Sequence, residues 1–274
     1  MKGSSFLVRA FWVGVATCFG ALVATAGEQV SSVDRGTEIA RAAEQSHSGF
    51  GSISAEGLMT LRDPNGHENE RRFDSHVLDD PEGYNRSLIE FVTPAEVKGV
   101  KLLTHGVADG QDNQWIFLKS LGRVKRISGA SSSNSFLGSE FSYEDLSSPK
   151  VEKFSFRWIN DEACPNSSDV PSLLVCDVIE RTPLDEYSGY SKSVVWIDRT
   201  LLLTHQIDFY DKQGRHIKTL DVHRHEKVDE VLWRVRDATM TNLLTQRSTQ
   251  MNWSGFDLSQ NYSLRDFDPR RLGR

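Results

Sequence analysis

The sequence predicts a mainly β fold in a single domain, and three observations support this prediction. From Ser52 onward, apolar and polar residues alternate with a period of two, and turn signals recur about every eight to twelve residues. One segment near the N-terminus has the spacing of a helix instead. No linker separates the 274 residues into two domains. Consecutive antiparallel strands at this spacing indicate a sandwich, a barrel or a strongly curved sheet.

The first 26 residues are predicted to be a secretory signal peptide. Lys2 and Arg9 precede an apolar run over 10–24, and Ala24-Thr25-Ala26 has the small residues of a cleavage site. Cys18 raises the alternative of a lipoprotein, but the apolar residues after it favour soluble export. We therefore expect cleavage after Ala26, a mature domain of residues 27–274 and a periplasmic location.

The charge of the mature chain argues against nucleic acid as a partner. Without Lys2 and Arg9 it has 30 cations against 38 anions, a net charge of about −8. Proteins that hold phosphate backbones are usually basic.

The helix is expected over residues 32–45. Val33, Ile39, Ala40 and Ala43 fall near one face, Ser31 or Ser32 precedes as a cap, and 48–51 breaks the pattern. About a dozen strands follow, over 52–62, 67–78, 84–93, 100–107, 113–119, 122–128, 151–160, 173–182, 190–198, 201–211, 215–227, 230–245 and 248–262.

Several of these strands are apolar on both faces. Continuous apolar runs occupy 115–118, 173–175, 194–197 and 201–203. Such strands must be covered on both sides. A curved sheet whose concave face is closed by the helix and by the Ser- and Gly-rich segment 129–149 would satisfy this. The interior would then either be filled with side chains or keep an apolar cavity for a ligand.

The two cysteines beyond the signal peptide, Cys164 and Cys176, suggest a disulfide at the base of a hairpin. The alternative is a pair of free thiols, since pairing depends on geometry.

Residues typical of catalysis are nearly absent. There is no Gly-x-Ser-x-Gly motif, and no His-Asp pair accompanies Ser131-Ser132-Ser133. His223 and His225 would share one face of a regular strand and are the best candidates for a metal site. No third ligand can be located, so a solvated strand is the favoured interpretation. We expect no enzyme activity, metal or cofactor.

The segment Gly138-Ser139-Glu140-Phe141-Ser142-Tyr143-Glu144-Asp145-Leu146 resembles a signature of the LolA-like outer-membrane lipoprotein-sorting proteins. Further segments that agree in order are Glu90-Phe91-x-x-Pro94 with 98–103, Gln114–Leu118 with 122–127, Tyr190-x-Lys192 with 196–198 and 209–214, and Lys218-Thr219-Leu220 with Met240-Thr241-Asn242.

This resemblance implies an unclosed, half-open antiparallel β-barrel of about eleven to twelve strands, with an N-terminal helix and a short lid across its concave face. It also implies a hydrophobic cavity for acyl chains of a lipoprotein or phospholipid. An inner-membrane transporter or an outer-membrane acceptor would be the protein partner. The alternative is a periplasmic scaffold without lipid cargo.

Large apolar residues in the matching segments are the candidate contacts of the cavity or lid, and ordinary core is the alternative for each. Trp115 and Phe117 share a face at positions i and i+2. The candidates are Phe91, Leu103, Trp115, Phe117, Phe136, Leu137 and Phe141.

Overall fold

The computed structural model describes residues 31–80, 84–147, 149–165, 174–230 and 232–273. The predicted signal peptide lies outside this part. Within it, no helix is both long and apolar enough to cross a membrane.

The described chain forms one α-helix followed by strands, as expected. The helix α1 spans Ser32–Ser46. The strands are β1 (Ser52–Arg62), β2 (Glu68–Asp79), β3 (Asn85–Thr93), β4 (Lys101–His105), β5 (Asn113–Leu118), β6 (Arg123–Arg126), β7 (Phe154–Ala163), β8 (Val175–Pro183), β9 (Tyr190–Asp198), β10 (Thr204–Asp211), β11 (His216–Lys227), β12 (Trp233–Asn242) and β13 (Ser248–Asp257).

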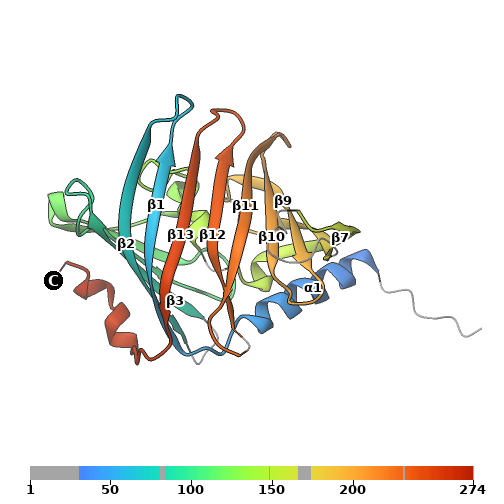
Figure 1. The fold of residues 1–274 in the computed structure, drawn as a ribbon, viewed down its shortest axis with the longest axis horizontal. Coiled ribbons are helices and arrows are strands. Elements are labelled where there is room, and N and C mark those ends of the chain that lie inside the picture. The colour runs from blue at the N-terminus through green and yellow to red at the C-terminus, as the bar shows by residue number, and fades with distance from the viewer. Residues whose placement is uncertain (1–30, 81–83, 148, 166–173, 231, 274) are drawn as a thin grey trace, which may run out of the picture. The chain divides into compact units, whose positions relative to one another are not determined.

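All thirteen strands belong to one antiparallel sheet, in the order β6-β5-β4-β3-β2-β1-β13-β12-β11-β10-β9-β8-β7. Successive strands are neighbours in the sheet except β6 and β7, and the pairing of β1 with β13 joins the two halves. Strands β6 and β7 are the free edges, so the sheet is unclosed. The prediction of an unclosed antiparallel barrel is confirmed, with thirteen strands instead of eleven or twelve. In Figure 1 the central strands β1, β13 and β12 stand side by side.

The helix α1 packs against β7 through a residue without a side chain. The Ser31 hydroxyl accepts a hydrogen bond from the Asp34 amide and caps the helix. A Cβ atom on Gly36 would lie 2.7 Å from the Trp158 amide nitrogen. Further along the same face, Ala40 packs into a cluster with Phe156 and Ile179. Val33, which the spacing placed on this face, is 52% exposed in the first helical turn.

A Cβ atom on Gly36 would collide with backbone atoms of β7. We therefore expect Gly36→Ala to displace α1 from β7. Forced overpacking typically costs about 1–3 kcal/mol. Urea unfolding should show this loss, whereas Glu38→Ala at an exposed position of the same helix should leave stability unchanged. Equal stabilities of the two variants would contradict the close packing.

The inner face of the sheet carries the largest apolar cluster. Phe73 and Phe91 face each other with ring centroids 5.8 Å apart, and Phe91 lies 5.8 Å from Phe136. Met240 and Met251 from β12 and β13 complete its centre. Phe136 and Phe141 come from the segment 129–149, which therefore covers the inner face of the central strands.

The outer face of β3, β4 and β5 is covered by the C-terminal segment, which the sequence pattern did not predict. Its two short 3₁₀ turns, Leu264–Phe267 and Pro269–Arg271, follow β13. Phe267 and Leu272 are buried against Leu78 and Leu103. Strands that are apolar on both faces are therefore covered on both faces here.

The expected strand over 201–211 begins only at Thr204. The Asp198 carboxylate accepts hydrogen bonds from the amides of Thr200, Leu201 and Leu203, at 2.9, 2.6 and 3.1 Å. These bonds close a turn over residues that look like a buried strand in the sequence. The interpretation of 201–203 as strand is wrong, because the buried carboxylate at the end of β9 organises the backbone.

Cys164 and Cys176 form the disulfide that their number suggested, with Cα atoms 5.0 Å apart. The bond lies where β7 and β8 end their pairing, since Glu162 pairs with Cys176.

We expect the double variant Cys164→Ala, Cys176→Ala to lose about 3 kcal/mol of unfolding free energy, the value of the loop-entropy model for a loop of this size. Urea denaturation of oxidised wild type and variant would measure it. A variant as stable as the wild type would show that the bond contributes nothing to the folded state.

Candidate ligand cavity

Two adjoining pockets open on the inner face of the sheet. The helix pocket, of about 340 Å³, lies under α1, and the loop pocket, of about 230 Å³, lies under the segment 129–149. Both are bordered by Pro149, Phe154 and Arg181, so they share one wall. Their sizes are near the lower end for small-molecule sites.

The wall of the helix pocket is mainly apolar because alternate residues of three neighbouring strands point inward. The strands β7 and β9 supply two of these residues each and β8 supplies one, and α1 adds two small side chains that leave space. These residues are Phe154, Phe156, Ile179, Val195, Ile197, Ala40 and Ala43. An acyl chain would meet hydrocarbon on most sides here.

The loop pocket has a polar wall whose groups bind one another. Asp145 accepts hydrogen bonds from the Tyr190 hydroxyl at 2.8 Å and from Lys218 Nζ at 3.0 Å. Glu144 accepts from the Gly189 amide at 2.9 Å and from the Ser188 hydroxyl. Burial raises the pKa of the Glu144 carboxyl, and it also raises the pKa of the Tyr190 hydroxyl. These carboxylates are already satisfied by neighbours.

Arg181 stands at the border between the two pockets. Its Nε donates to the Ser193 hydroxyl at 2.7 Å, and its guanidinium lies 4.9 Å from the centre of the Phe154 ring. Burial lowers the pKa of Arg181 to about 10, an effect that nearby Asp145 and Glu144 oppose. It therefore remains a cation at neutral pH.

Arg234 lines the helix pocket beside the C-terminal end of α1. Its guanidinium lies 4.3 Å from the centre of the Phe50 ring, within the range of a cation–π contact. Burial lowers the pKa of Arg234 to about 10 as well. The helix pocket thus combines an apolar wall with two arginines.

The comparisons with known proteins agree with this architecture. A family model described only as an uncharacterized protein matches residues 83–274. The crystal structure of an outer membrane lipoprotein-sorting protein domain from Vibrio parahaemolyticus superposes with a TM-score of 0.83 at 33% identity, over 88% of this chain and 100% of that one. The chain belongs to the LolA-like family of outer-membrane lipoprotein-sorting proteins.

Two further structures resemble this LolA-like chain. A DUF1329 family protein from Desulfovibrio piger has a TM-score of 0.81 at 27% identity, covering 89% of this chain and 100% of that one. A LolA superfamily protein from Nitrosomonas europaea has a TM-score of 0.66 at 17% identity, covering 87% and 98%, and shows the fold alone. No curated protein sequence matches the chain.

The residues proposed from the sequence as cavity or lid contacts are divided between two faces. Phe91, Phe136 and Phe141 lie together in the inner cluster with Leu137 packed against it, and Phe141 borders the loop pocket. The other three, Leu103, Trp115 and Phe117, lie together on the outer face.

The outer three pack against the C-terminal segment, away from both pockets. Trp115 and Phe117 do share a face, as their spacing required. The period-two pattern determines which residues of a strand share a face, but it does not determine which face points to the interior. The inward residues of β7, β8 and β9 and the two arginines were missed. The apolar run over 194–197 was a sequence signal for the two β9 residues, and no pattern singled out the others.

The strand that carries His223 and His225 is not regular. Shifts in register occur on both sides of Arg224. The exposed His223 ring is hydrogen-bonded to the Thr239 hydroxyl, whereas the His225 ring packs edge-on against His205. The two histidines were expected to share one face of a regular strand. They do not, because the pairing of β11 with β12 is irregular at this point.

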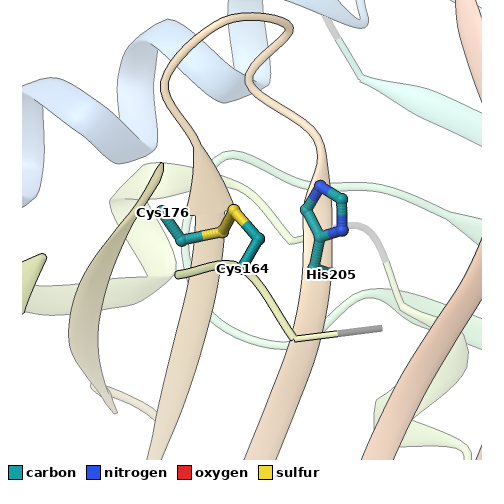
Figure 2. A group of neighbouring side chains, drawn as sticks. All are labelled: Cys164, Cys176 and His205. Carbon is teal, nitrogen blue, oxygen red and sulfur yellow. A yellow bond between two sulfur atoms is a disulfide. The ribbon is translucent and has the colours of Figure 1, made fainter. Parts of the chain in front are cut away.

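A different group of metal-ligating residues lies close together among the described residues, namely Cys164, Cys176 and His205. Figure 2 shows the His205 ring on the strand beside the disulfide. Since the two sulfur atoms are bonded to each other, they are not thiolate ligands in this state.

The lowered pKa of His225 predicts that the protein loses stability in mild acid. Burial and the neighbouring His205 lower the pKa of His225 to about 4, from an ordinary value of 6.5, despite the opposing charge of Asp198. Between these values the unfolded chain binds more protons than the folded one. The unfolding free energy should therefore fall as pH drops from about 6.5 to about 4.

Urea unfolding at several pH values measures this effect. His225→Gln should reduce the slope without abolishing it, because burial also lowers the pKa of His47, His76 and His105. His223→Gln is the control at an exposed position. An unchanged slope in His225→Gln would show that His225 does not contribute.

Proposed function

We propose that this LolA-like protein is a non-enzymatic carrier that holds acyl chains of a lipoprotein or phospholipid in its inner cavity. The supporting observation is the helix pocket, a mainly apolar space of about 340 Å³ bordered by α1 and the inner faces of β7, β8 and β9. The lipoprotein-sorting name of the similar domain from Vibrio parahaemolyticus points the same way.

Acyl-chain binding needs no reaction chemistry. Each methylene group that leaves water for an apolar wall contributes about 0.8 kcal/mol. A few methylenes in the helix pocket would therefore give useful affinity without a cofactor or a metal. The acids of the loop pocket are engaged with neighbouring donors, which suits a structural role.

Location and partners are part of the proposal. Cleavage after Ala26 would release residues 27–274 as a LolA-like lipid-binding domain in the periplasm. Cargo would come from an inner-membrane transporter or pass to an outer-membrane acceptor. Release then requires a change that reduces the cavity, and α1 and the segment 129–149 are the elements that cover it.

A fluorescent fatty-acid analogue tests the proposal directly. Its emission should increase on binding to the lipid-free protein, and unlabelled lipid should reverse the increase. An absence of saturable binding would favour the alternative of a periplasmic scaffold without lipid cargo.

A further inference from the structure

A buried nitrogen at the end of α1 has no partner. Among the side chains that the structure describes, His47 Nδ1 is the one buried nitrogen or oxygen atom without a hydrogen bond. The other ring nitrogen, Nε2, lies 3.2 Å from the Leu202 carbonyl oxygen and donates to it. Nδ1 is then an acceptor with nothing to accept. Buried polar atoms are nearly always satisfied, so this one suggests a missing donor.

Arg234 stands beside this histidine and is short of acceptors. Its nitrogen atoms reach the Trp233 carbonyl oxygen at 3.2 Å and the His47 carbonyl oxygen at 3.4 and 3.5 Å. In the described part of the chain, no carboxylate lies within ion-pairing distance of it.

The acids whose charges act on Arg234 bind elsewhere. Asp79 accepts from the Gly49 amide, and Asp229 accepts from the Leu232 amide at 2.7 Å. A guanidinium held over the Phe50 ring thus faces the helix pocket with unused donors.

We propose that Arg234 and His47 form a head-group site for an anionic amphiphile whose acyl chain lies in the helix pocket. This inference rests on the proposed carrier function and adds the chemical class of the cargo. The guanidinium donates to an anionic oxygen, and His47 Nδ1 accepts from a hydroxyl. The monoanion of a phosphate monoester, or a phosphodiester whose head group has a hydroxyl, offers both groups.

Arg181 provides a matched control within the same cavity. It too lies over a phenyl ring, that of Phe154, and lines the helix pocket. However, it donates to the Ser193 hydroxyl, and Glu144 and Asp145 are the acids whose charges act on it. Among the described residues, no unpartnered buried acceptor lies beside it, so it is expected to be part of the wall.

Calorimetric titration of the lipid-free protein with ligands of one chain length separates these roles. At about pH 6, near the second pKa of a phosphate monoester, a large share of dodecyl phosphate has both the anion and the hydroxyl. Dodecanoate has the anion, and dodecanol has the hydroxyl. We expect dodecyl phosphate to bind at least about tenfold more tightly than dodecanol, as for a charge-assisted hydrogen bond. Arg234→Met should remove this preference while dodecanol affinity is retained, which also shows that the variant is folded.

Two further variants and inorganic phosphate identify which groups cause the preference for dodecyl phosphate over dodecanol. His47→Phe should weaken dodecyl phosphate but not dodecanoate, and Arg181→Met should leave the preference unchanged. Inorganic phosphate alone should not bind, because the chain supplies most of the affinity.

Equal binding of all three ligands by the wild type would overturn this inference while leaving the carrier function intact. A preference that survives Arg234→Met would do the same. Binding of inorganic phosphate as tight as that of dodecyl phosphate would also overturn it, since the site would then recognise a free anion. If none of the three dodecyl ligands binds the wild type, the carrier function itself fails.

Discussion

Ala43→Trp should strongly weaken acyl-chain binding while the protein stays folded. Ala43 lies on the face of α1 that borders the helix pocket, where its small side chain leaves the space open. An indole at this position would occupy the volume that an acyl chain needs. We expect the affinity for the fluorescent fatty-acid analogue to fall at least about tenfold, since a few excluded methylenes at ~0.8 kcal/mol each exceed the 1.4 kcal/mol of a tenfold change.

Gln45→Trp is the matched control for this substitution. Gln45 is exposed on the same helix, so the added indole stays in solvent. Both variants should unfold cooperatively, with Ala43→Trp losing about 1–3 kcal/mol if the indole overpacks the helix. Wild-type affinity in Ala43→Trp would show that the acyl chain does not use the helix pocket.

Phe91→Ala should produce the largest loss of stability among the sequence-derived candidates. The Phe91 side chain is 0% exposed and lies between the rings of Phe73 and Phe136. Removal of a fully buried phenyl ring costs about 3–5 kcal/mol, because the transfer free energy is lost and a cavity remains. Urea unfolding measures this loss.

Phe154→Ala distinguishes core from cavity. Phe154 is only partly buried and borders both pockets, so its removal should cost less stability and weaken acyl-chain binding more. If Phe91→Ala instead lost binding with little change in stability, Phe91 would be a ligand contact and not core.

The order of elements was readable from the sequence because local patterns determine it. Period-two alternation and turn residues placed the strands, and the Ser31 cap and apolar spacing placed α1. The Leu201–Leu203 run was misread because its conformation depends on the buried Asp198 carboxylate, which no periodicity reveals. The C-terminal cover was missed because Phe267 and Leu272 lie in short 3₁₀ turns without a repeating pattern.

The candidate site was less accessible from the sequence than the fold. Alternation paired Trp115 with Phe117 correctly, but the side that becomes the interior depends on what covers each face. The cavity wall combines single residues from α1 and from strands far apart in the chain, such as Ala43, Arg181 and Arg234. Their meeting is a property of the curved sheet and of the helix that crosses it.

Native mass spectrometry of the protein purified from the periplasm without detergent tests the central claim most directly. Organic extraction would then identify any bound molecule. The account predicts one adduct per chain that extracts as a phospholipid or an acylated peptide, and that Ala43→Trp lacks. A clean mass of the protein alone, with no lipid gained after incubation with phospholipid vesicles, would contradict the carrier function.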